Sequence, residues 1–257
     1  MLEVKQVVKN FGGLTALNKV HMRVSQSEIL GLIGPNGSGK TTLFNVICGF
    51  YQATSGQVIF DGRNITNLKA HQIAQLGISR VFQSPTQFSA LSVLDNVFTG
   101  YHMSYKTKIW KRLFRIPEAL REERTFKRNA LEILDFAGLN SLKNEMAGNL
   151  SYGDQRILGV CISLATKPKL LLLDEPVAGM SPMERSNMVN LIHQIRDQGI
   201  TILIVEHDMK TIINLCDRLV CLRSGEIISE GLPQEVCSDE CVIEAYLGNT
   251  ECNSNAA

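Results

Sequence analysis

The sequence lacks any uninterrupted apolar run of the roughly 18 to 20 residues that crosses a bilayer, although 44% of its 257 residues are hydrophobic. It also lacks a charge excess, because 26 Lys and Arg balance 25 Asp and Glu. Such a balance argues against a broad basic face for duplex nucleic acid. The opening residues MLEVK contain no apolar segment of the kind that directs secretion. We therefore expect a chain that is neither secreted nor membrane-spanning, and no nucleic-acid partner.

Support for disulfides is also missing, because the seven cysteines are odd in number and most of them lie in apolar runs. Cys237 and Cys241 lie close together near the end of the chain, but two ligands without further partners make a weak zinc site. We therefore expect reduced thiols, as in cytosolic proteins, and no structural metal.

Short apolar segments alternate with helical periodicity, which is typical of an α/β protein with a mostly parallel sheet. Strands are predicted over 28–33, 169–174 and 200–205, with antiparallel hairpin strands over 2–8 and 57–60. From 91 to 166 the strand pattern gives way to helices, which Pro117 separates. The sequence therefore predicts a helical unit inserted into an α/β core, followed by a frayed, disordered tail over 248–257.

The segment GPNGSGKTT follows the apolar run ILGLI and fits the pattern G-x-x-x-x-G-K-[ST]. Its glycines let successive N–H groups curl around phosphate oxygens, and the following helix adds its positive end. Lys40 is predicted to reach the β- and γ-phosphates, and the Thr41 hydroxyl to ligate Mg²⁺. The alternative is a strand–helix turn that needs glycines for its own geometry. The predicted phosphate-binding residues are Gly34, Pro35, Asn36, Gly37, Ser38, Gly39, Lys40, Thr41 and Thr42.

A second acidic motif, LLLLDE, places two carboxylates at the end of an apolar strand. Asp174 emerges at the carboxyl end, where open α/β sheets bind ligands, and is predicted to hold Mg²⁺ directly or through water. Glu175 points elsewhere and is predicted to polarise the attacking water. Two adjacent carboxylates favour ATP hydrolysis over kinase chemistry, in which the base acts on a substrate hydroxyl. The alternative is an ordinary acidic loop.

With these two motifs in this order and a helical segment between them, the chain resembles an ABC-type ATPase subunit. The resemblance implies an α/β fold with a P-loop NTPase (RecA-like) core, an antiparallel β subdomain and an inserted α-helical subdomain. It implies one ABC-type ATP-binding domain over 1–247, with the helical subdomain at about 91–166. It also implies ATP and Mg²⁺ as cofactors and ATP hydrolysis as the activity.

The remaining motifs of the family follow in order. Phe11 stands where the family places an aromatic ring against adenine. Gln83, in VFQSP, matches the residue that senses Mg²⁺ and touches the membrane partner, which gives it metal and catalytic roles. His207, in VEHD, matches the switch histidine near the γ-phosphate. Ser151 and Gly153, in LSYGDQ, match the signature motif that completes the ATP site of an opposing subunit.

The signature motif has a direct physical interpretation. Ser151 is a good N-cap and Gly153 permits close backbone approach, so a helix from about Gly153 offers free N–H groups to a phosphate. One P-loop and one signature motif in the chain predict a dimer, with itself or with a similar subunit. Two departures from the family pattern are Asp154, an anion close to the expected phosphate, and Ser181, where many relatives have Asp.

Within the family, the chain resembles the ATPase subunit of high-affinity branched-chain amino-acid importers through GISRVFQ, LSYG and EHDMK. This resemblance implies a peripheral motor on the cytoplasmic face of the cell membrane that drives separate permease subunits. A periplasmic or surface substrate-binding protein is then an indirect partner. Three alternatives stay open: a urea or amide importer ATPase, a soluble ABC-type ATPase in cofactor assembly, and an ATP-binding module without turnover.

Overall fold

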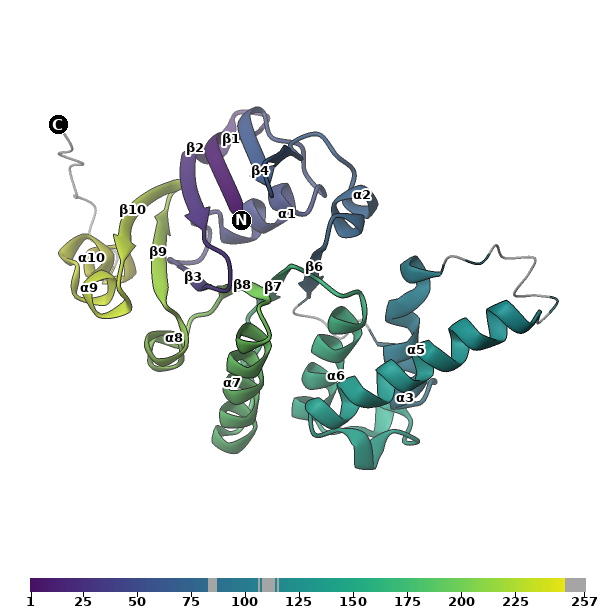
Figure 1. Ribbon diagram of the computed structural model, residues 1–257. Helices are drawn as coiled ribbons and strands as arrows, with labels where there is room; N and C mark the ends of the chain where they lie inside the picture. The colour runs from purple at the N-terminus through teal and green to yellow at the C-terminus, as the bar shows by residue number, and fades with distance from the viewer. Residues whose placement is uncertain (83–86, 106, 108–113, 115, 248–257) are drawn as a thin grey trace. The chain divides into compact units, whose positions relative to one another are not determined.

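The computed structural model describes residues 1–82, 87–105, 107, 114 and 116–247. The chain divides into two compact units, coloured by residue number in Figure 1. The first unit consists of Met1–Arg80, Lys169–Ala178 and Ile192–Ala257, and the second of Val81–Pro168 and Gly179–Leu191. The predicted site residue Gln83 and the predicted tail over 248–257 lie outside the described residues.

An antiparallel sheet of four strands forms one layer of the first unit (Figure 1). Its order is β2-β1-β4-β5, with β1 (Leu2–Phe11), β2 (Leu14–Val24), β4 (Ser55–Phe60) and β5 (Arg63–Asn64). The predicted hairpin strands are confirmed, although β1 continues to Phe11. Asp61 and Gly62 turn the chain between β4 and β5 with φ values of 48° and 77°. Two positive φ values suit the tight turn that joins twisted antiparallel strands.

The six-stranded sheet of the α/β core has the order β10-β9-β3-β8-β7-β6. Its strands are β3 (Ile29–Ile33), β6 (Ile78–Val81), β7 (Leu170–Asp174), β8 (Thr201–Val205), β9 (Arg218–Arg223) and β10 (Glu226–Gly231). Strand β3 is parallel to both β8 and β9, and β7 is parallel to β8. The predicted parallel core is therefore confirmed, and each predicted core strand begins at the next residue along. Among the strand pairs described for this sheet, only β10 and β9 are antiparallel.

Helix α1 (Lys40–Ile47) shares one hydrophobic core with strands of both sheets. Its Phe44 side chain is fully buried in one cluster with Leu2 of β1 and Leu30 of β3. Complete burial of such a side chain contributes roughly 1.5 to 3 kcal/mol relative to exposure. The other helices of this unit are α2 (Ala70–Gln75), α8 (Met209–Leu215), α9 (Pro233–Ser238) and α10 (Glu240–Leu247).

The second unit is helical. Its described helices are α3 (Val93–Thr99), α5 (Pro117–Phe136) and α6 (Tyr152–Ala165), with 3-10 turns η1 (Gly100–Ser104), η2 (Asn140–Leu142) and η3 (Ala147–Asn149). Helix α7 (Pro182–Asp197) begins in this unit. Pro117 occupies the first turn of α5, where its missing N–H costs nothing.

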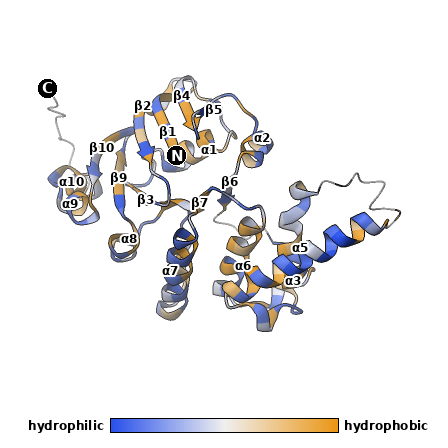
Figure 2. Cartoon of the chain, in the orientation of Figure 1, coloured by the Kyte–Doolittle hydropathy of each residue, from blue (hydrophilic) through white to orange (hydrophobic). Residues whose placement is uncertain are grey.

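Amphipathic patterning explains how α5 packs. Phe126, Ala130 and Leu134 recur at helical spacing and are buried, whereas most of α5 is hydrophilic in Figure 2. None of the helices in the described part of the chain combines the length and apolarity that a membrane span requires.

Candidate active site

The loop between β3 and α1 borders a cavity of about 500 Å³ in the first unit. The cavity brings together Phe11, residues 36–42 of the loop and the start of α1, Glu175 and His207, which were predicted from distant parts of the sequence. A cavity of this volume falls within the range of small-molecule sites. Three of the predicted motifs, the P-loop, the acidic strand end and the histidine after β8, therefore converge on one cavity.

Glycine is required at two positions of the loop. Gly34 has φ +144°, and a Cβ atom there would lie 2.0 Å from the Leu222 carbonyl oxygen. Gly39 has φ +110°, and its Cβ would lie 2.7 Å from the Ala16 carbonyl oxygen. Both the backbone conformation and the packing therefore exclude larger residues. The loop is pressed against its neighbours on one side and open to the cavity on the other.

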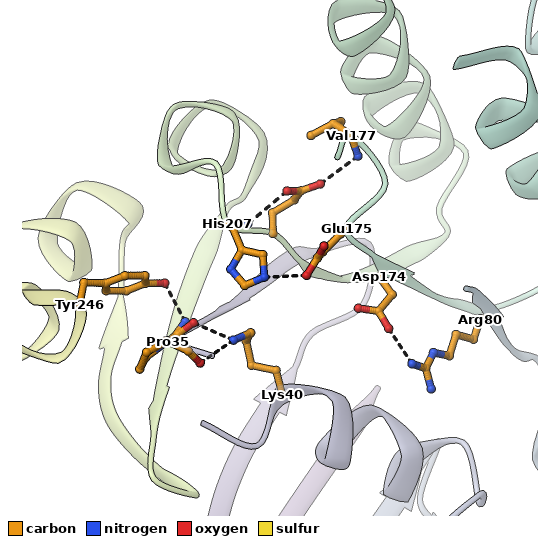
Figure 3. A network of polar contacts seen from close by, with 10 residues as sticks. Pro35, Lys40, Arg80, Asp174, Glu175, Val177, His207 and Tyr246 are labelled. Atoms are coloured by element: carbon orange, nitrogen blue, oxygen red, sulfur yellow. Dashed lines mark hydrogen bonds and ion pairs between the residues drawn. The ribbon is translucent and has the colours of Figure 1, made fainter. Parts of the chain in front are cut away.

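Lys40 is the first residue of α1, where the loop ends. Its Nζ donates to the Gly34 carbonyl oxygen at 2.7 Å and to the Pro35 carbonyl oxygen at 2.9 Å (Figure 3). Burial lowers the pKa of Lys40, and the nearby Glu175 carboxylate opposes that shift. The first N–H groups of a helix have no intrahelical partner, so cation and helix end together favour an anion here.

Asp174 ends β7 as predicted, but its carboxylate already has a cationic partner in the chain. Arg80 Nη2 lies 2.6 Å from Asp174 Oδ2 (Figure 3). Arg80 Nη1 donates to Asn45 Oδ1 at 2.7 Å. The guanidinium also lies over the Phe44 ring, 5.5 Å from its centroid. Arg80 was missed as a site residue, because the segment GISRVFQ in which it lies was used only for the resemblance to importer subunits.

Glu175 and His207 face each other across the ends of β7 and β8. His207 Nε2 lies 2.6 Å from Glu175 Oε1 (Figure 3). The Glu175 backbone has φ +50°, and its N–H donates to the Val205 carbonyl oxygen at 2.9 Å. A positive φ at a residue other than glycine is unfavourable and concentrates at functional sites. The fold thus holds the Glu175 carboxylate at the cavity beside the imidazole.

Glu206 is a second residue that sequence reasoning missed. Its buried carboxylate accepts hydrogen bonds from the Val177 N–H at 2.9 Å and from the His207 N–H at 3.2 Å. Burial raises the pKa of Glu206, and the Glu175 charge nearby adds to the shift. Glu206 therefore ties together the segments that follow β7 and β8. Its sequence signal was a carboxylate placed directly after the apolar run at residues 202–205.

Phe11 lines the cavity and packs against a second aromatic ring. The Phe11 ring is exposed and meets Tyr51 edge to face at 5.2 Å between centroids. Lys9 Nζ lies 4.7 Å from the Phe11 centroid. An exposed ring with one polarised face is a suitable platform for a planar base.

Ser151 and Gly153 belong to the second unit. Ser151 is the N-cap of α6, and its Oγ accepts from the Asp154 N–H at 3.1 Å. The Asp154 carboxylate, predicted to stand near a phosphate, accepts from the Ser151 hydroxyl at 2.8 Å. Glu184 lies against Gly153, where an added Cβ would meet its Oε1 at 2.5 Å. Hydrogen bonds from Ser181 lower the pKa of Glu184, and Gly153 and Ser151 contribute.

The described residues contain no metal site built from several acidic, histidine or cysteine side chains. No group of three or more His, Cys, Asp or Glu there is arranged to hold a metal ion. The candidate ligands in this region are Asp174 at the end of β7 and the exposed Thr41 in the first turn of α1.

Comparison with known proteins gives consistent matches. Residues 17–178 match the family model described as ABC transporter, and residues 226–251 match that of the branched-chain amino acid ATP-binding cassette transporter. The chain is 37% identical over 249 residues to the high-affinity branched-chain amino acid transport ATP-binding protein BraF of Pseudomonas aeruginosa. That alignment covers 96% of this chain and 98% of the relative.

Solved structures show the same similarity. The ADP conformation of an ATP-binding cassette of an ABC transporter matches with a TM-score of 0.85 and 35% identity, covering 97% of this chain and 99% of the other. The dimeric structure of a bacterial ABC transporter cassette matches with a TM-score of 0.76 and 26% identity, covering 91% of this chain and 99% of the other.

Proposed function

This chain belongs to the ABC transporter family, and we propose that it is the ATP-hydrolysing subunit of an importer for branched-chain or related amino acids. One observation carries the proposal: the loop of residues 36–42, Glu175 and His207 line a single cavity. Anion-binding and water-activating groups thus face the same space. The similarity to BraF, whose name states branched-chain amino acid transport, supports the choice of cargo.

Nucleotide binding is assigned to the P-loop and the ring at the mouth of the cavity. The backbone N–H groups of residues 36–42 and the start of α1 would hold the phosphates, with Lys40 supplying the positive charge. In the structure Lys40 Nζ donates to two loop carbonyls, so it is already directed along the loop. Phe11 would stack on the adenine.

Hydrolysis is assigned to Glu175 and His207. Water attacks the γ-phosphorus in line with the leaving oxygen, and Glu175 would accept a hydrogen bond from that water and polarise it. His207, 2.6 Å from Glu175 Oε1, would orient the carboxylate and face the γ-phosphate. Glu206 positions the segments that follow β7 and β8 by accepting hydrogen bonds from the backbone N–H groups of Val177 and His207. A positioned general base of this kind contributes roughly 10² to 10⁴ in rate.

The oxygen ligands offered by Asp174 and Thr41 fit a Mg²⁺ ion. Carboxylate and hydroxyl oxygens are the ligands that this cation prefers, and it binds with one or two carboxylates plus substrate phosphates. Asp174 and Thr41 would hold it, and Gln83 is the further predicted ligand. When bound, Mg²⁺ neutralises charge that develops on the phosphate oxygens. Because Arg80 pairs with Asp174, the residue that would hold the cation is already balanced by an internal positive charge.

ATP-binding subunits of this family work with membrane permeases and dimerise, and the dimeric cassette is an example of the dimer. For this chain, a second copy or a similar subunit would place Ser151 and Gly153 against the partner's nucleotide. The chain would lie peripherally on the cytoplasmic face of the membrane. A substrate-binding protein outside the membrane would select the cargo and reach this subunit only through the permease.

Glu175→Gln tests the catalytic assignment. We expect turnover to fall roughly 10²-fold or more while ATP binding persists and a dimer accumulates. Glu132→Gln makes the same replacement of a carboxylate by a carboxamide at an exposed position of α5. It is the matched control and should retain turnover. Hydrolysis by Glu175→Gln at the wild-type rate would contradict the assignment.

Cargo is tested in membranes that contain this chain with its permease subunits. We expect a binding protein loaded with leucine to stimulate ATP hydrolysis. Stimulation only by a urea- or amide-loaded binding protein would favour the urea or amide alternative. Turnover unaffected by any permease would favour a soluble ATPase.

A further inference from the structure

The C-terminal helix α10 reaches the P-loop through one side chain. Gly34 donates its backbone N–H to the Tyr246 hydroxyl oxygen at 2.9 Å, and Figure 3 shows the hydroxyl directed at the loop beside Pro35. Val242 and Ala245, on the same helix, are buried and anchor it. The contact joins residues 212 positions apart in the sequence, both in the first unit.

Gly34 is the residue at which the chain leaves β3 and enters the loop, and it is held on three sides. Its N–H meets Tyr246, and its carbonyl oxygen accepts from Lys40 Nζ at 2.7 Å. Its α-carbon faces the Leu222 carbonyl oxygen, which a Cβ atom would approach to 2.0 Å. Any displacement of Gly34 therefore also displaces an acceptor of the lysine that would bind phosphate.

The exposure of Tyr246 is informative about its role. Tyr246 is 40% exposed, while its hydroxyl meets a buried backbone donor. A buried N–H that loses its acceptor is destabilised by its own desolvation. Burial raises the pKa of Tyr246, so the hydroxyl stays neutral at physiological pH.

We propose that Tyr246 is a positioning residue of the phosphate site, which makes nucleotide affinity depend on how α10 is seated. The hydroxyl fixes Gly34, and Gly34 in turn fixes the carbonyl that directs Lys40. This inference rests on the proposed function of the loop as a nucleotide site. It assigns to the C-terminal helix a role in ATP binding in addition to packing.

Tyr246→Phe removes only the hydroxyl and is the variant to test. We expect the Kd for a fluorescent N-methylanthraniloyl ATP to rise roughly three- to tenfold, the range of one net hydrogen bond. The rise should be the same with Mg²⁺ and with EDTA, because the contact is to the loop. The KM for ATP should rise while kcat stays close to wild type, as expected for lost binding. Tyr101→Phe, a buried tyrosine stacked on Phe126 in the second unit, is the matched control and should leave Kd unchanged.

The outcomes separate this inference from the function on which it rests. Wild-type protein that fails to bind the fluorescent ATP would overturn the proposed function itself. Wild-type binding together with a Tyr246→Phe Kd within about twofold of it would overturn the inference, even if thermal stability fell.

If Tyr246→Phe does not fold, hydrogen exchange of the wild-type Gly34 amide decides the question. Slow exchange, comparable to that of the β3 amides, is expected for a donor held by Tyr246. Exchange as fast as at the exposed Asn36 would overturn the inference.

Discussion

The ion pair between Arg80 and Asp174 predicts a large and specific coupling energy. Arg80→Met removes the cation and leaves the Asp174 carboxylate, only 12% exposed, without its charged partner. Asp174→Asn keeps an acceptor of the same shape but removes the charge. The two changes and their combination form a double-mutant cycle that isolates the pair from other effects of each substitution.

The expected magnitude follows from distance and burial. Arg80 Nη2 and Asp174 Oδ2 are 2.6 Å apart, and the two side chains are 6% and 12% exposed. At an effective dielectric constant of about 20, two charges about 4 Å apart interact by about 4 kcal/mol. Arg80 keeps its contacts with Asn45 and Phe44 when Asp174 is replaced, which reduces the loss. We therefore expect Arg80→Met to lower the free energy of unfolding by about 3 kcal/mol. The coupling energy between Arg80 and Asp174 should be about 2 kcal/mol.

Urea and thermal unfolding, in EDTA and without nucleotide, measure this effect. A loss of about 3 kcal/mol lowers Tm by about 6 to 12 °C for a chain of this size. Asp174→Asn should cost less, because the amide oxygen still accepts from the guanidinium. Single substitutions that add to within about 0.5 kcal/mol of the double variant would refute the reasoning, since independent sites are additive to that extent.

Three further predictions concern the loop, Glu206 and the α6 cap. Gly34→Ala should abolish ATP binding and lower Tm, because its Cβ would lie 2.0 Å from a carbonyl oxygen; normal binding in a fluorescence titration would contradict this. Burial raises the pKa of Glu206 above 4.5, so its contribution to stability is greatest at acid pH and falls as pH rises through the folded value. The unfolding free energy of wild type minus that of Glu206→Gln should therefore decrease from pH 4 towards pH 7; a difference that does not change with pH would contradict the raised pKa. Ser151→Ala and Ser92→Ala each remove an N-cap and should each lower the free energy of unfolding by about 1 kcal/mol. Only Ser151→Ala should also lower ATP turnover. Equal turnover by the two variants would exclude a role for the Ser151 cap at a nucleotide.

Much of the site could be predicted from local sequence, because its chemistry lies in short segments. A run of apolar residues ending in a glycine-rich loop and a lysine predicts both a buried strand and a phosphate site. The Asp174–Glu175 step predicts a metal ligand and a base because strand ends of a parallel sheet share one edge. The helical face of α5 and the turn at Asp61 and Gly62 were likewise predictable from periodicity and backbone preference.

The fold class and the order of motifs were therefore determined by the sequence itself, since each motif is a run of neighbouring residues. The tertiary structure alone decided which side chains complete them: Arg80 on Asp174, Glu206 on the segments after β7 and β8, and Tyr246 on Gly34. These pairs carry no local pattern. They form because parallel pairing of β3, β7 and β8 brings their ends together, and because α10 packs against α9 and β10 within the first unit.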